Sequence, residues 1–173
     1  MDRFEKQREL KTMERVHKIY EHPLFRECLE KNCEAEKERA FCRHDMAHFM
    51  DVARLSYIFS LEREYAVPKE EIYAAALLHD IGKWKQYKDG TPHDRASALL
   101  AEEILQEADY SKEETERILN AILCHRSYDG KKENHQLAEI LYDADKISRA
   151  CYACPAKKEC NWSEDKKNKK IIW

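Results

Sequence analysis

The chain has 173 residues, of which 43% are apolar and 38% are charged, so it is long enough for one domain with a closed hydrophobic core. Its 31 basic and 34 acidic residues give a net charge of −3, which is too balanced to indicate a nucleic-acid or membrane partner. Glycine (3) and proline (4) are scarce, and this favours long helices over a sheet with many turns.

The first residues contain no apolar signal core, and no run of about 18 apolar residues could span a bilayer. We therefore expect a cytoplasmic protein. The seven cysteines are an odd number without a secretion signal, which indicates free thiols or a metal site rather than a disulfide framework.

The first part of the chain is predicted to form three helices. The first covers residues 4–20 and ends at His22-Pro23, after which a second helix follows. The third begins near Phe41, because apolar residues recur from there at intervals of three and four. On that helix His44 and His48 lie one turn apart and therefore face the same side.

A strongly apolar helix is predicted in the middle of the chain. Pro68 suits its first turn, where the missing N–H is harmless. The helix runs from Glu70 to about Ile81 and ends at Gly82, a natural C-terminal stop. Residues 85–90 are expected to form a loop, and the segment Trp84 to Gly90 is expected to shape a substrate pocket.

Two later helix starts carry a capping-box pattern, in which Ser or Thr is followed three residues later by an acidic residue. Thr91 and Asp94 form the first pair, and Ser111 and Glu114 form the second. After a turn at residues 128–130, a last long helix covers roughly residues 136–150. Two-residue alternation is nowhere convincing, so the predicted fold class is all-α.

Five histidines and aspartates stand where the predicted helices meet the apolar core: His48, His79, Asp80, His125 and Asp145. His79 and Asp80 directly follow the apolar run, where an unpaired buried carboxylate would be costly. A metal cation removes that cost, and imidazole with carboxylate suits Mn, Fe, Mg, Ni or Zn in differing degrees. Adjacent residues on a helix differ by about 100° in direction, so both reach one ion only near a helix end.

The ordered set of His48, the segment Leu77-Leu78-His79-Asp80-Ile81-Gly82-Lys83 and Asp145 resembles the HD superfamily of metal-dependent phosphohydrolases. The resemblance covers about residues 40–150. It implies an HD-domain helical bundle with a central divalent metal, held by His48, His79, Asp80 and Asp145, and hydrolysis of phosphate esters. We expect a single HD-type domain over 1–173, with N-terminal helices over 1–39 and a cysteine-containing segment over 151–173.

His93 and His125 resemble the additional ligands of the dinuclear members of this superfamily. With them the chain supplies six ligands, enough for two ions that share a bridging carboxylate such as Asp80. One or two ions per chain are therefore expected. If only one ion binds, His93 and His125 instead steady the substrate phosphate or the attacking water.

Catalytic roles are predicted for Asp80, Lys83, His93 and His125. A divalent metal lowers the pKa of a bound water towards neutrality, and Lys83 and Arg126 can neutralise the phosphate oxygens. The departing alkoxide needs a proton, which a histidine that is not a metal ligand could give. Asp45 and Asp94 are alternatives, and we favour His44 as support for the ligands rather than as a ligand.

The predicted function is metal-dependent hydrolysis of a phosphate ester, with a nucleotide or another small phosphorylated metabolite as substrate. Two alternatives stay open: a mixed-valence di-iron oxygenase that uses the same six ligands, and a non-catalytic sensor that binds a nucleotide. No membrane partner is expected, a nucleic-acid partner is not favoured because no aromatic stacking platform is apparent, and a homo-oligomer stays open.

The cysteines near the C-terminus allow two interpretations. Cys151 and Cys154 have C-x-x-C spacing and Cys160 follows, a pattern typical of half a zinc site. Reduced thiols that pack a loop are the simpler interpretation. A structural zinc or an iron–sulfur cluster would need a fourth ligand from Cys42, Cys124 or elsewhere.

Overall fold

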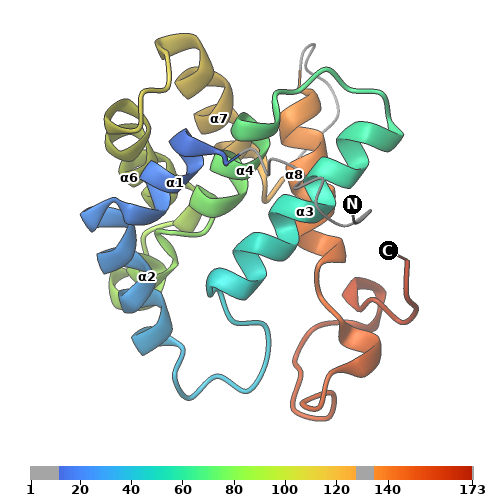
Figure 1. Ribbon diagram of the computed structural model, residues 1–173. Coiled ribbons are helices and arrows are strands. Elements are labelled where there is room, and N and C mark those ends of the chain that lie inside the picture. The colour runs from blue at the N-terminus through green and yellow to red at the C-terminus, as the bar shows by residue number, and fades with distance from the viewer. Residues whose placement is uncertain (1–11, 128–134, 173) are drawn as a thin grey trace, which may run out of the picture.

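The computed structural model describes residues 12–127 and 135–172, which form eight α-helices, two short 3-10 helices and no strand (Figure 1). The expected all-α class is therefore confirmed. Residues 4–11 of the first expected helix and the expected turn at 128–130 lie outside the described residues. The helices are α1 (Glu14–Glu21), α2 (Pro23–Ala35), α3 (Met46–Glu62), α4 (Lys69–Leu78), α5 (Lys83–Asp89), α6 (His93–Glu107), α7 (Lys112–Cys124), α8 (Gln136–Ile147), η1 (Cys151–Ala153) and η2 (Glu164–Lys166).

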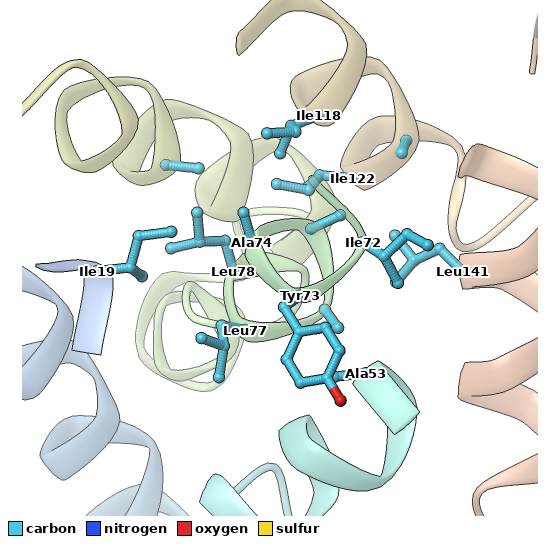
Figure 2. Packing of buried hydrophobic residues seen from close by; sticks show 14 of the residues in the cluster. Ile19, Ala53, Ile72, Tyr73, Ala74, Leu77, Leu78, Ile118, Ile122 and Leu141 are labelled. Carbon is cyan, nitrogen blue, oxygen red and sulfur yellow. The ribbon is translucent and has the colours of Figure 1, made fainter. Parts of the chain in front are cut away.

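Helix α4 is the centre of the bundle. Eight of its ten residues, from Glu71 to Leu78, are buried, as expected of a helix that is apolar on all sides. It contacts α1, α3, α6, α7 and α8, and Figure 2 shows its side chains surrounded by residues from α1, α3, α7 and α8. The residues that follow α4 are therefore delivered to the middle of the molecule.

Three predictions for the chain up to Gly90 differ from the structure. The third helix begins at Met46 rather than near Phe41, because Cys42 has a left-handed backbone (φ 49°) that interrupts a helix and Asp45 caps the first turn. Residues 85–90 are not a loop, since α5 covers Lys83–Asp89 and ends at Gly90, which has φ 79°. The apolar helix ends at Leu78, so His79 and Asp80 lie in a turn between two helices.

One of the two expected capping boxes is present. The Ser111 hydroxyl accepts a hydrogen bond from the Glu114 amide (3.3 Å), and the Glu114 carboxylate accepts one from the Ser111 amide (2.8 Å). The prediction of a capping box at Thr91 and Asp94 is wrong. Pro92 takes the N-cap position of α6, so Thr91 lies one residue too early and its hydroxyl donates to Asp89 instead.

The last helix begins at Gln136 as expected and ends at Ile147, three residues earlier than the sequence suggested. Within residues 12–127 and 135–172, the helices are all too short or too polar to serve as a bilayer span.

Candidate metal centre

Six side chains from five parts of the bundle converge beside the end of α4. His79 and Asp80 follow α4 directly, and His48 lies in the first turn of α3. The others come from α6, from the residue after α7 and from α8. Together they form two groups of donor atoms: His48, His79, Asp80 and Asp145, and Asp80, His93 and His125.

The first group has its donor atoms within 4.8 Å of one another. The Nε2 atom of His79 lies 3.2 Å from Asp80 Oδ2 and 3.8 Å from Asp145 Oδ1. The Nε2 atom of His48 lies 4.0 Å from Asp80 Oδ2 and 3.6 Å from Asp145 Oδ1. Two imidazoles and two carboxylates therefore face one point, a donor set that suits Fe, Mn or Zn.

The second group meets the other oxygen of Asp80. Its Oδ1 atom lies 3.2 Å from His93 Nε2 and 3.5 Å from His125 Nε2. Each carboxylate oxygen of Asp80 thus belongs to a different set of histidines. A carboxylate that bridges two ions requires this arrangement. The sequence suggested a bridging role for Asp80 but could not establish it.

Hydrogen bonds orient three of the histidines towards the centre. His79 Nδ1 lies 2.7 Å from the carbonyl oxygen of Ala76, and His125 Nδ1 lies 2.6 Å from that of Ile122. A carbonyl only accepts, so Nδ1 carries the proton and Nε2 is left to act as ligand. The amide oxygen of Gln86 accepts from His93 Nδ1 in the same way, and such outer partners fix the orientation of metal ligands.

The buried polar atoms of the centre fit a divalent cation. His48 Nε2, His79 Nε2 and Asp80 Oδ1 are buried without a hydrogen-bond partner in the described part of the chain, although buried polar atoms are nearly always paired. Burial lowers the pKa of His48 to about 4, so its imidazole keeps a lone pair at neutral pH. A cation in the first group would satisfy the two histidine nitrogens, and a cation in the second group would satisfy Asp80 Oδ1.

The charges of the centre also favour a bound cation. Burial opposes ionisation of Asp80 and Asp145, yet His79 holds the pKa of both carboxyl groups below the ordinary value. Burial alone would lower the pKa of His79, but the two carboxylates raise it to about 10. The site therefore attracts positive charge strongly, and a divalent ion would supply it in place of a proton on His79.

The turn that carries His79 and Asp80 is held from both sides. The fully buried Asn32 donates from Nδ2 to the Asp80 carbonyl (3.0 Å) and accepts from the Trp84 amide (2.8 Å). Gly82 donates to the Ser97 hydroxyl (2.9 Å), and a Cβ atom at Gly82 would lie 2.6 Å from the Ser97 nitrogen. Gly82 is thus needed for close contact with α6 rather than as a helix stop.

His44 reaches the centre from the loop before α3, not from the helix on which we expected it. Its Nε2 atom lies 3.6 Å from Asp80 Oδ2, and its Nδ1 donates to Glu36 Oε1 (2.5 Å). Glu36 is buried and also accepts from the Tyr87 hydroxyl (2.6 Å). Glu36 was not predicted from the sequence, because nothing local distinguishes it from the glutamates of α2, the helix that ends one residue before it.

Lys146 pairs with Asp145 (2.6 Å), and the two cations predicted to contact phosphate lie near the centre at different depths. Lys83 is half-buried, with Nζ 3.4 Å from His93 Nδ1. Burial lowers the pKa of its ammonium group, against the pull of Asp80. Arg126 is exposed and pairs with Asp94 (3.1 Å). Lys83 is therefore the better placed of the two predicted phosphate contacts, and Arg126 lies at the rim.

Comparison with known proteins gives consistent results. Residues 45–150 match the HD domain family. An uncharacterized protein of Clostridium beijerinckii is 47% identical over 145 residues, which cover 84% of this chain and 90% of that protein. Ribonuclease Y 1 of Pediococcus pentosaceus is 30% identical over 105 residues, 60% of this chain but 18% of that protein. The crystal structure of a predicted HD superfamily hydrolase from an uncultured Thermotogales bacterium has the same fold, with a TM-score of 0.59 and 23% identity over 82% of this chain and 80% of that one.

Proposed function

The chain belongs to the HD domain family, and from this membership and the geometry of its centre we propose that it hydrolyses phosphate esters with the help of divalent metal ions. His48, His79, Asp80 and Asp145 would hold one ion, and His93 and His125 would join Asp80 at a second. One observation carries the proposal: the two carboxylate oxygens of Asp80 face two separate sets of histidines.

Bound divalent ions supply electrostatic stabilisation of a phosphate and lower the pKa of a water. The side chains of this chain contribute orientation and charge. Lys83, beside His93, is placed to neutralise the oxygens of a phosphate that meets the centre, since charge-assisted contacts strengthen as those oxygens gain charge. Arg126 reaches the same region from the rim, where its pairing with Asp94 leaves it a weaker contact.

His44 is the residue best suited to give a proton to the leaving group. Its Nδ1 is hydrogen-bonded to Glu36, which fixes the orientation of the ring, and its Nε2 lies 3.6 Å from Asp80 Oδ2. The two alternatives are engaged elsewhere: Asp45 caps α3, and Asp94 pairs with Arg126. Although burial opposes it, Arg126 holds the pKa of Asp94 below the ordinary value, so Asp94 stays ionised.

A small phosphorylated molecule, such as a nucleotide, is the proposed substrate. The net charge of −3 gives no support to tracking of a long nucleic acid, which requires an extended basic surface. The likeness to Ribonuclease Y 1 nevertheless supports including phosphodiesters among the candidates. The half-buried Lys83 beside the centre favours phosphate over the uncharged C–H substrate of a di-iron oxygenase.

An anaerobic assay is the test, because hydrolysis needs no O₂. The protein is loaded with Mn²⁺ or Fe²⁺ and offered nucleotides, sugar phosphates, a phosphodiester and a short RNA. Release of inorganic phosphate or of a mononucleotide without O₂ is expected. Turnover that requires Fe²⁺ and O₂ on a substrate without phosphate would establish the oxygenase instead, and nucleotide binding without turnover would establish the sensor.

Lys83→Met provides the matched variant. Loss of one such contact should reduce the rate by about 10²–10³-fold, while the metal content stays constant because lysine is not a proposed ligand. Lys88→Met, an exposed position on the same helix, is the control and should keep the rate of the unmodified protein. Equal rates for both variants would contradict the proposed role of Lys83.

A further inference from the structure

Four of the seven cysteines line one pocket. Cys42 comes from the loop before α3, and Cys151, Cys154 and Cys160 come from the segment after α8. The pocket has a volume of about 390 Å³ and also reaches His48. In Figure 1 the loop that follows α2 and the segment that follows α8 both lie at the lower end of the molecule. The remaining cysteines, Cys28, Cys33 and Cys124, do not line this pocket.

The backbone of each of the two segments has a distinct local conformation at its cysteines. The 3-10 turn Cys151–Ala153 brings the ends of the C-x-x-C pair together, with the Cys154 amide donating to the Cys151 carbonyl (3.4 Å). Cys42 has a left-handed backbone, a conformation that is costly for a residue with a side chain and persists where the surroundings impose it. Arg39 imposes it by donating from Nε to the carbonyls of Phe41 (2.8 Å) and Cys42 (3.1 Å).

Four cations and two carboxylates, Asp45 and Asp51, line the pocket that holds the four thiols. The cations are Arg43, Arg149, Lys157 and Lys167. The charge of Arg149 acts on Cys42, and Lys167 lies within electrostatic range of Cys151 and Cys160. Burial raises the pKa of the Cys42 thiol, and Arg149 opposes that rise.

The spacing of the sulfur atoms distinguishes between metals. A tetrahedral zinc with Zn–S bonds of about 2.3 Å brings its sulfurs to about 3.8 Å from one another. Among the described residues, no three of these thiols lie within 4.8 Å of one another, since the only groups that do are the histidine and aspartate sets. An iron–sulfur cubane holds its four thiolates farther apart, because each binds a different iron at the outside of the cluster.

We propose that Cys42, Cys151, Cys154 and Cys160 bind a four-iron, four-sulfide cluster. The cluster joins the C-terminal segment to the loop that leads into α3. It thereby fixes the segment that carries His44 and His48 beside the hydrolytic centre. This site is separate from the histidine and aspartate ligands, and its existence does not depend on the reaction that they support.

The test is anaerobic purification followed by measurement of iron and acid-labile sulfide. About four of each per chain are expected for one cluster, together with broad brown absorption. Sulfide is the decisive quantity, because iron bound by His48 and its neighbours brings none. Protein that contains one zinc per chain and no sulfide would overturn the cluster, and so would protein in which these four thiols are free or form disulfides.

Substitution identifies the ligands. Cys42→Ser, Cys151→Ser and Cys160→Ser should each lose most of the sulfide and the colour. Cys33→Ser, at an exposed position of α2, and Cys124→Ser should keep both. Equal sulfide content in all five variants would overturn the assignment.

A second measurement uses the unmodified chain in case the variants do not fold. Under native anaerobic conditions, alkylation should modify Cys33 but not the four ligand cysteines, and removal of iron by a chelator should make those four reactive. Reactivity of the four before iron removal would overturn the proposal. Neither result depends on whether the protein hydrolyses a phosphate ester, so failure of the cluster and failure of the proposed function remain distinguishable.

Discussion

His93 Nε2 and His125 Nε2 lie 3.2 Å apart, although 32 residues separate them in the chain. Each Nδ1 is already bound, to Gln86 and to the Ile122 carbonyl respectively. Two imidazoles that direct the same ring nitrogen at one point are suited to share a cation there. Asp80 Oδ1 completes this second group of donors.

His125→Ala should therefore reduce the metal content from about two ions per chain towards one under saturating Mn²⁺. The remaining ion should stay because the first group contains no atom of His125. Metal analysis after gel filtration measures the change. His17→Ala, at an exposed position of α1, is the control, and two ions retained in the His125 variant would contradict the dinuclear assignment.

Asp80→Ala should have the larger effect, since one of its oxygens belongs to each group. We expect loss of most of the metal and of all detectable turnover, while the helical circular-dichroism spectrum remains. Asp51→Ala removes an exposed carboxylate from α3 and should change neither quantity. Full metal content in the Asp80 variant would show that the centre has been assigned wrongly.

The role of His44 can be separated from that of the ligands. His44→Gln should slow hydrolysis of an ester with a poor leaving group by about 10²-fold, as expected for loss of a general acid. An ester whose leaving group needs no proton, such as a nitrophenyl phosphate, should react at nearly the unchanged rate. Glu36→Gln should show the same pattern more weakly, because Glu36 acts through His44.

Metal content is the accompanying readout for both variants and should not change. An equal loss of rate on both classes of ester would show that His44 has a structural role or is itself a ligand. His135→Gln, which removes an imidazole paired with Asn120, serves as the control.

Gly82→Ala should destabilise the protein by about 1–3 kcal/mol. The added Cβ would lie 2.6 Å from the Ser97 nitrogen and 2.7 Å from the Ala96 carbonyl carbon, both of them backbone atoms that cannot move aside cheaply. Urea unfolding measures the change. Gly90→Asn is the matched control, because nothing lies within 4 Å of that position and asparagine tolerates its φ of 79°.

Ser111→Ala should cost about 1 kcal/mol by removing the N-cap of α7. Thr91→Ala should cost less, because Thr91 caps no helix although its sequence context resembles a capping box. Thermal unfolding of the two variants in parallel tests the difference. Equal destabilisation would mean that the Asp89–Thr91 contact stabilises the start of α6 as much as a true cap does.

Local features were well predicted from the sequence. The apolar run before His79 identified the buried helix α4, and the Ser111–Glu114 pattern identified the start of α7. The ordered HD motif identified the family and the all-α class. The first two depend on residues within one or two turns of one another, where spacing along the chain fixes spacing in space, whereas the HD motif depends on the order of residues from His48 to Asp145.

Other local predictions failed where a longer-range contact competed with the pattern. The helix expected from Phe41 is interrupted at Cys42, whose backbone is held by Arg39. The segment expected to be a loop after Gly82 forms α5, because Asn32 and Ser97 fix the turn before it. The expected role of Trp84 to Gly90 in shaping a substrate pocket stays a prediction.

The sequence by itself determined which residues could bind metal and in what order they occur along the chain. Only the tertiary structure decided that the two carboxylate oxygens of Asp80 belong to two different groups of donors and that Glu36 accepts a hydrogen bond from His44. It also decided that Cys42, rather than Cys124, lines a pocket with Cys151, Cys154 and Cys160. The physical reason is that these distances are set by how helices far apart in sequence pack around α4. Packing depends on the whole buried surface, and no local spacing encodes it.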